Sequence, residues 1–244
     1  MSVSHTPEVH AHAHPELGFL RKYMFSEDHK VIGIQFLFSG LLALFLGGAL
    51  ALLVRLQLGW PSGTIPVVGR WFPEAWGQRM SSDFYSMAFS MHATIMIFFV
   101  IIPWLTGAFG NFLIPLMIGA RDMAFPKLNM MSYWFMWPAF AFMLCGFFVD
   151  GGAAASGWTS YPTLASAAMS PGQGFWSPAQ PGSGMGQIFW LLALIFVGVS
   201  SMMGSVNYLT TIINGIRKLP NAPVKSGMMT KKIITVACIL KAIE

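Results

Sequence analysis

The chain contains little charge and little cysteine. Lysine, arginine, aspartate and glutamate together make up 9% of its 244 residues, against roughly 25% in soluble domains. Hydrophobic residues make up 55%, so the composition favours a membrane-embedded protein over a soluble one. The two cysteines, Cys145 and Cys238, form no Cys-x-x-Cys pair. This absence excludes an iron–sulfur centre, a zinc ribbon or a binuclear copper thiolate site built from this sequence alone.

Long apolar runs are the main feature that is present. Four of them are long enough for a bilayer-spanning helix, which needs about 20 residues. They cover residues 31–54, 84–118, 128–149 and 186–214. The second run exceeds the length of one crossing, and Pro103 and Pro115 within it can bend or end a helix. The sequence therefore predicts an all-α integral membrane protein with four transmembrane helices.

Basic residues are distributed unequally about these runs. With four crossings, eleven lysines and arginines fall on the side of the N-terminus and only Arg55, Arg70 and Arg79 on the other. Basic residues favour the cytoplasmic side, so we expect a cytoplasmic N-terminus in a multi-pass protein of the bacterial cytoplasmic membrane. The bases flank membrane spans and form no separate basic patch. The expected surroundings are therefore a lipid bilayer, and nothing supports a nucleic-acid partner.

The chain divides into three parts. Residues 1–29 form a polar tail without the pattern of a cleavable signal peptide. His-Ala-His-Ala-His at 10–14 suits either a metal-binding tract or a solvated tail, and the tail is the expected reading. Residues 30–217 hold the four predicted spans. Residues 218–244 are basic, with an apolar run too short to cross a bilayer.

His92 lies inside the second apolar run. The stretch 84–120 around it carries no formal charge. An imidazole in a membrane span is costly to desolvate, so it normally faces a partner inside a helix bundle. That partner can be a metal, since imidazole is the commonest metal ligand, or a polar group of a neighbouring helix. From this histidine alone, both interpretations stay open.

Five motifs in order, across residues 22–217, resemble subunit I of the haem–copper respiratory oxidases. They are Asp28-His-Lys-Val-Ile-Gly33 with Arg55, Met91-His-Ala-Thr-Ile-Met-Ile-Phe-Phe99, Gly110-Asn-Phe-Leu-Ile-Pro through Asn129, Gly157-Trp-Thr-Ser-Tyr-Pro162, and Gly198-Val-Ser-Ser through Asn214. The resemblance implies that the four helices are the first part of a twelve-helix bundle. It also implies a terminal oxidase that passes electrons through a low-spin haem a to a haem a3–copper B centre, reduces dioxygen to water and pumps protons.

The resemblance also assigns residues to the haem. His92 matches an axial ligand of the low-spin haem iron, and the second axial ligand belongs to a later helix. Arg55 matches an arginine near the haem formyl group, although an interfacial anchor is the alternative. Trp158 matches a residue near the haem propionates, and an aromatic belt explains it almost as well. Tyr85 matches a tyrosine near the porphyrin, with core packing as the alternative.

A second group of residues matches the proton pathway of the family. Asp122 corresponds to the aspartate at the cytoplasmic mouth of a proton-conducting channel. On its own, an aspartate beside Arg121 and Lys127 would be read as solvated charge. Amides and hydroxyls can orient water without trapping a proton, and the residues that match the polar lining of this channel are Asn111, Asn129, Asn207, Ser200 and Ser201.

Two substitutions and one boundary depart from the family pattern. Arg121 stands where many members have proline, and Met130 replaces the second residue of a frequent asparagine pair. The resemblance ends near Arg217, before the helices that would hold the copper B histidines, the haem a3 ligand and the distal haem a ligand. This chain alone is therefore not expected to assemble the dioxygen-reducing centre, and no catalytic residue is assigned within it.

The expected partners are the rest of subunit I, oxidase subunits II and III, and cytochrome c as electron donor. A quinol oxidase of the same superfamily is the alternative to a cytochrome c oxidase. A truncated, non-catalytic membrane fragment and a small transporter are two further hypotheses from different classes. A fragment with a single axial ligand is expected to bind no haem stably.

Overall fold

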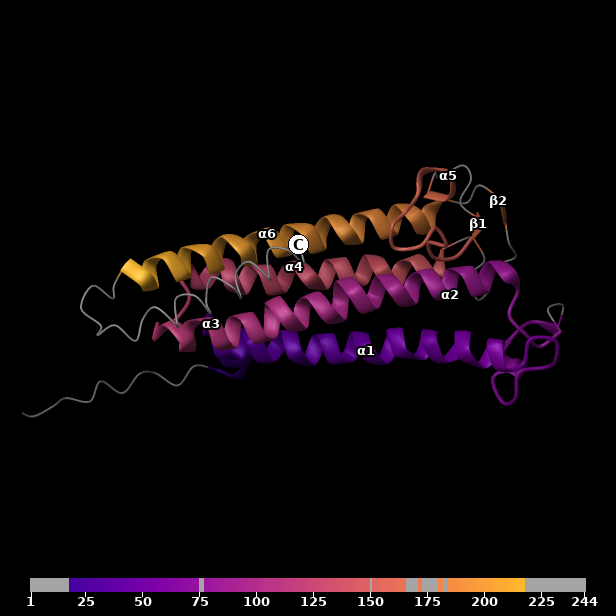
Figure 1. The fold of residues 1–244 in the computed structure, drawn as a ribbon, viewed down its shortest axis with the longest axis horizontal. Coiled ribbons are helices and arrows are strands. Elements are labelled where there is room, and N and C mark those ends of the chain that lie inside the picture. Colours follow the sequence, from indigo (N-terminus) through magenta and orange to yellow (C-terminus); the bar gives the residue numbers. More distant parts are fainter. Residues whose placement is uncertain are drawn as a thin grey trace, which may run out of the picture.

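The computed structural model describes residues 18–74, 77–149, 151–165, 171–172, 180–181 and 184–217. The histidine tract at 10–14 and the predicted basic tail 218–244 lie outside these residues. Within them, four long helices run side by side in an elongated bundle (Figure 1). The helices long and apolar enough to cross a membrane are His29–Gly59, Ser82–Ile118, Pro126–Phe148 and Met185–Gly215. The prediction of a four-helix membrane-spanning fold is confirmed: each helix begins slightly before its predicted run, and only the first extends several residues beyond the predicted end.

The first and last spans are uninterrupted α-helices. Helix α1 (His29–Gly59) begins at Asp28, whose side chain accepts a hydrogen bond from the backbone N–H of Lys30 at 2.8 Å. This is an N-cap, which satisfies one of the N–H groups that the first helical turn leaves unpaired. Helix α6 (Met185–Arg217) has 33 residues. At 1.5 Å per residue it is about 50 Å long, enough to project beyond the hydrocarbon core of a bilayer.

The second span changes its winding along its length. It begins as α2 (Ser82–Ile95), continues through the π-helical segments Met96–Ile101 and Pro103–Gly110, and ends as α3 (Asn111–Ile118). Pro103 lacks an N–H and its ring crowds the preceding turn, so the regular hydrogen-bond ladder cannot continue through it. The Thr106 hydroxyl donates to the carbonyl oxygen of Ile102 at 2.8 Å. The proline that the sequence placed inside this span thus widens the helix without ending it.

Glycines let helix α1 approach the second span closely. A Cβ on Gly33 would lie 3.0 Å from the carbonyl oxygen of Ala108, and one on Gly47 would lie 3.0 Å from Met96 Sδ. A Cβ on Gly40 would collide with the indole of Trp104. These glycines recur every seven residues and therefore lie on one face of α1. Small residues at such contacts are the usual means by which membrane helices pack together.

The other pair of neighbours is α4 (Pro126–Cys145) and α6, which pack along their length (Figure 1). A short loop joins α3 to α4 at one end of the bundle. It starts at Gly119, which adopts the left-handed conformation with φ 68° that ends many helices. At the opposite end lie the 3-10 turns Gly69–Trp71 and Gly146–Phe148, the short helix α5 (Pro162–Ala165) and a two-residue pairing of β1 (Pro171–Gly172) with β2 (Gln180–Pro181). Asp122 and Trp158 consequently lie at opposite ends of the bundle.

Candidate functional site

His92 makes a hydrogen bond to the neighbouring helix. Its Nδ1 atom lies 2.9 Å from the carbonyl oxygen of Gly47 on α1. A carbonyl oxygen can only accept, so Nδ1 carries the proton and Nε2 keeps its lone pair. A neutral imidazole fixed through one nitrogen by a backbone carbonyl is the usual form of a histidine that binds a metal through the other. The two interpretations left open by the sequence, a polar partner and a metal ligand, are thus compatible.

A metal bound here would need ligands besides protein side chains. Among the described residues, no group of three His, Cys, Asp or Glu side chains could hold a metal ion. The donor set therefore does not fit a metal ion ligated only by the described part of the chain. A single imidazole with a free ring nitrogen is compatible with a haem, whose iron would need few ligands from the protein.

The other residues assigned to the haem lie along the same part of the bundle. Tyr85 is half-buried against the hydrophobic core and lies seven residues before His92, on the same face of α2. Arg55 is an exposed residue of α1, eight residues beyond Gly47. Trp158 is 47% exposed, and its ring lies 6.4 Å from that of Phe98. The structure describes no contact that joins these three side chains to one another.

Buried polar side chains hold the loop that carries Trp158. The Ser90 hydroxyl on α2 accepts a hydrogen bond from the backbone N–H of Gly157 at 2.9 Å. On α6, Gln187 accepts from the Ser156 hydroxyl at 3.0 Å and donates to Ser160 Oγ at 3.1 Å. Gln187 is 2% exposed. No sequence motif pointed to this glutamine, which fixes the position of the loop on both sides of Trp158.

Asp122 lies in the loop between α3 and α4, beside a cavity of about 600 Å³. Its carboxylate accepts a hydrogen bond from the backbone N–H of Met123 at 2.7 Å. Burial raises the pKa of Asp122 above the ordinary carboxyl value, and the backbone N–H groups of Met123 and His29 and the charge of His29 oppose that rise. Asp122 is therefore a partly desolvated acid at the end of the bundle, which differs from the solvated charge that its basic sequence neighbours indicated.

His29 is a buried residue that the sequence analysis left in the polar tail. It is the first residue of α1 and is 2% exposed. Its Nδ1 atom donates to the carbonyl oxygen of Asn111 on α3 at 2.9 Å. The sequence Asp28-His-Lys30 reads as solvated, so only the three-dimensional arrangement indicates that this imidazole faces Asp122 and α3.

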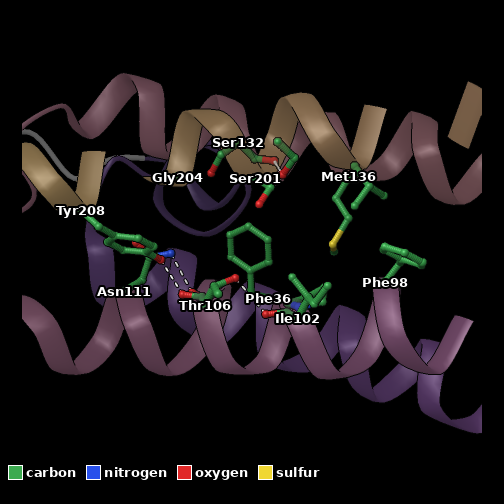
Figure 2. Close-up of a pocket in the computed structure, with 14 residues that line it drawn as sticks. Phe36, Phe98, Ile102, Thr106, Asn111, Ser132, Met136, Ser201, Gly204 and Tyr208 are labelled. Atoms are coloured by element: carbon green, nitrogen blue, oxygen red, sulfur yellow. Dashed lines mark hydrogen bonds between the residues drawn. The ribbon is translucent and has the colours of Figure 1, made fainter. Parts of the chain in front are cut away.

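A small cavity, partly open to the surface, lies between α1, the second span, α4 and α6. Its volume is about 40 Å³, room for about three water molecules at 10–15 Å³ each. Figure 2 shows the ring of Phe36 among the labelled side chains, with Asn111, Thr106 and Tyr208 toward one end and Met136 and Phe98 toward the other. The polar side chains that line the cavity include three of the predicted pathway residues, Asn111, Ser200 and Ser201, together with Ser132 and Thr106.

Two buried asparagines, Asn111 of this cavity and Asn129 outside it, have unused hydrogen-bonding capacity. Asn111 donates to the carbonyl oxygen of Gly107 at 2.6 Å, but its buried Oδ1 has no partner within the described structure. Asn129 is completely buried, and neither of its side-chain polar atoms has such a partner. Ser200 donates to the carbonyl oxygen of Ser132 at 2.6 Å. Buried polar atoms normally have partners, so the unpaired amides mark positions suited to ordered water.

Asn207 is engaged differently from the other predicted pathway residues. It does not line this small cavity; its amide pairs with the backbone of Phe125, accepting from the N–H at 2.9 Å and donating to the C=O at 3.3 Å. One turn further along α6, the Thr211 hydroxyl accepts from the N–H of Ala124 at 2.9 Å. Both side chains attach the loop that carries Asp122 to α6. Thr211 was not singled out from the sequence.

Fold and site together define a multi-pass α-helical membrane protein with an imidazole that is hydrogen-bonded through Nδ1 to a backbone carbonyl, and with amides and hydroxyls between its helices. The family model described as cytochrome c and quinol oxidase polypeptide I matches residues 31–243. The chain belongs to this family. The matched region extends beyond residue 217, where the motif resemblance ends.

Curated relatives agree with this assignment. The chain is 38% identical over 190 residues to cytochrome c oxidase subunit 1 of Thermostichus vulcanus, a match that covers 78% of the chain and 29% of the relative. It is 38% identical over 200 residues to the protein of the same name from Synechocystis, covering 82% and 31% respectively. It is also 37% identical over 211 residues to an alternative cytochrome c oxidase subunit 1 of Bradyrhizobium diazoefficiens, covering 85% and 31%. The chain thus spans about three tenths of the length of the relatives it matches.

Proposed function

We propose that this chain is the N-terminal part of subunit I of a haem–copper terminal oxidase, in which it binds the low-spin haem and begins a proton pathway. The observation that carries the proposal is the hydrogen bond from His92 Nδ1 to Gly47, because it leaves Nε2 as a neutral metal ligand. Family membership supports the choice of haem over other metal centres.

His92 is the proposed axial ligand. Its bond to Gly47 orients the imidazole and raises its basicity, as outer-shell partners of metal-bound histidines do. When bound, haem a supplies reversible one-electron transfer. Arg55 is proposed to contact the formyl group and Trp158 to lie near the propionates, with Tyr85 packed near the porphyrin on the same helix face as His92. The hydrogen bonds that Ser90 and Gln187 make to the loop would fix the backbone that carries Trp158.

Asp122 and the buried polar residues are proposed to conduct protons. Asp122 would take a proton at the cytoplasmic end, where its raised pKa favours the protonated form. Waters held by Asn129 and Asn111 and by the hydroxyls of Ser200 and Ser201 would carry it inward. Asn207 is proposed to support this pathway indirectly: its hydrogen bonds to Phe125 would fix the loop that carries Asp122.

The complete subunit is proposed to reduce dioxygen to water at a haem a3–copper B centre and to pump protons. The residues for that centre would come from the rest of subunit I, and subunits II and III are the expected partners. Cytochrome c is the proposed donor because three relatives carry cytochrome c oxidase in their names. The family description also includes quinol oxidases, so a quinol is the alternative donor. The proposed orientation places the N-terminus and Asp122 on the cytoplasmic side.

Two measurements on the assembled complex test this proposal. A reduced-minus-oxidised visible spectrum is expected to show a low-spin haem signal that His92→Ala removes and Gly48→Ala leaves intact, since a Cβ on Gly48 meets no atom within 4 Å. Dioxygen consumption is expected with reduced cytochrome c and not with a quinol. A low-spin signal unchanged in His92→Ala contradicts the ligand assignment, and turnover with quinol alone contradicts the proposed donor.

A further inference from the structure

Two cavities lie along the proposed proton pathway, and a small group of apolar side chains separates them. The larger cavity, beside Asp122, is lined by the loop between α3 and α4 and by the ends of α3 and α6. The small cavity lies further along the bundle and reaches Asn111 on α3 and Tyr208 on α6. Among the described residues, none lines both cavities. A proton that enters at Asp122 therefore has to cross the part of the bundle between them.

The separating side chains form a buried apolar cluster that is distinct from the main core of the bundle. This apolar barrier consists of Ile114, Ile118, Met123, Tyr208 and Ile212. Ile118 and Met123 also line the larger cavity, and Tyr208 also lines the small one. The barrier thus reaches from one cavity to the other.

The barrier covers about two helical turns of the second span. Asn111, Ile114 and Ile118 are buried positions three and four residues apart, so they lie on one face of α3. From Asn111 to Ile118 the rise is about 10 Å at 1.5 Å per residue. One water molecule joins polar atoms that are at most about 6 Å apart. A proton carried along this face would therefore need more than one water molecule inside the barrier.

Close packing leaves little room for that water. A Cβ on Gly215 would lie 2.8 Å from Cδ1 of Ile118, and one on Gly110 would lie 3.1 Å from the hydroxyl oxygen of Tyr208. The Tyr208 hydroxyl donates to the carbonyl oxygen of Thr106. This bond fixes the tyrosine ring between α6 and the second span.

The polar groups at the edges of the barrier are engaged with the protein backbone. On the side of the larger cavity, the Thr211 hydroxyl donates to the carbonyl oxygen of Asn207 at 2.6 Å and accepts from the N–H of Ala124 at 2.9 Å. On the other side, the hydroxyl hydrogen of Tyr208 is directed to Thr106. Water inside the barrier would mainly meet aliphatic side chains, a thioether and an aromatic ring. Apolar spaces of this kind stay dry, because a bound water molecule needs several polar partners.

We propose that the apolar barrier is a hydrophobic gate that limits the rate of proton uptake. Hydrophobic constrictions in membrane proteins close a pathway by excluding water. Protons from Asp122 reach the small cavity only while the side chains of the barrier move apart and admit water. The proposal rests on the proposed proton pathway and adds a rate-limiting step to it.

Single-turnover proton uptake by the assembled complex in lipid vesicles tests the gate. Ile212 is 7% exposed and belongs to the barrier. Ile212→Ser and Ile212→Ala remove most of the same side chain, but only serine adds a partner for water. Ile212→Ser is expected to speed uptake on the order of threefold or more. Ile212→Ala should change it much less, because the space that alanine leaves is apolar.

Ile213→Ser is the matched control, since Ile213 is the next residue of α6 and is 52% exposed. Its rate of uptake should equal that of the original protein. A cluster that serves only packing would give Ile212→Ser and Ile212→Ala variants that are both less stable and no faster in uptake, which would overturn the gate.

Asp122→Asn distinguishes a failure of the gate from a failure of the pathway. Slower uptake in Asp122→Asn, combined with the original rate in Ile212→Ser, would overturn the gate and leave the pathway intact. Uptake unaffected by Asp122→Asn would contradict the pathway and the gate with it. Faster uptake in Ile212→Ser that disappears when Asp122→Asn is added would support the gate.

Discussion

The side-chain amide of Asn207 on α6 pairs with both backbone groups of Phe125, the residue before Pro126 at the start of α4. Asn207 is fully buried, so this pair replaces water at both groups. The pairing joins residues 82 positions apart and fixes the loop in which Asp122 lies.

Replacing Asn207 tests this role. Asn207→Leu keeps the branched shape of the side chain and leaves the N–H of Phe125 unpaired, which costs about 1–3 kcal/mol; the C=O of Phe125 keeps the hydrogen bond from the N–H of Asn129 at 3.0 Å. We expect a clearly lower thermal midpoint in detergent, whereas Thr210→Ala, which removes only a bond to Val206 within α6, should change it little. Equal midpoints for the two variants would show that the loop is held by other contacts.

Asp122→Asn is expected to affect stability and proton uptake differently: stability should rise at high pH, whereas proton uptake should fall. Burial raises the pKa of Asp122, so its ionised form is the unfavourable one in the folded protein. The protonated acid and the amide should be equally stable at low pH. As the pH rises through the carboxyl pKa, the variant should become more stable than the original protein, because only the latter then carries a buried charge. Thermal midpoints across pH measure this difference.

The same substitution should slow proton uptake at every pH, because an amide cannot accept and release a proton. The rate of proton uptake by the complex reconstituted in lipid vesicles measures this effect. Uptake at the original rate in Asp122→Asn would show that protons enter elsewhere. A loss of stability at neutral pH would mean that the carboxylate has a structural partner that outweighs its desolvation.

Asn129→Leu should preserve stability while reducing proton uptake. Neither polar atom of Asn129 has a hydrogen-bond partner in the described part of the chain, so an apolar residue of similar size removes unpaired groups and no protein–protein hydrogen bond. Ser200→Ala is a useful comparison, because it removes the hydrogen bond to Ser132. A much lower thermal midpoint in Asn129→Leu would contradict the interpretation that this amide binds mainly water.

Two adjacent glycines of α1 provide a matched pair. Gly47→Ala places a methyl group 3.0 Å from Met96 Sδ and beside the carbonyl that accepts from His92. Overpacking of this kind costs about 1–3 kcal/mol, and the low-spin haem band should shift with it. Gly48→Ala meets no atom within 4 Å and should stabilise α1 slightly through helix propensity. Identical melting curves and spectra for both variants would contradict the close α1–α2 contact.

Local sequence information was sufficient for the fold and insufficient for much of the site. Apolar run length determines where a span can form, so all four spans were predictable. The π-helical winding after Met96 was not, since the same prolines are also compatible with a kink or a helix end. The chemical roles proposed for His92 and Asp122 came from motif resemblance and stay predictions.

The residues that the sequence analysis missed depend on distant partners. His29 reads as polar tail because Asp28 and Lys30 flank it, and only the contact with Asn111 reveals its burial. Gln187 is one amide in an apolar run, and its role follows from two serines about 30 residues away. Asn207 was selected as a pathway residue, but its pairing with Phe125 could not be read from spacing.

The central claim is that His92 Nε2 binds the low-spin haem iron, and chemical rescue of His92→Gly in the assembled complex tests it most directly. The account predicts that the low-spin signal disappears in the variant and returns when imidazole is added, because free imidazole can occupy the vacated axial position. A low-spin signal that persists in His92→Gly without imidazole would contradict the account.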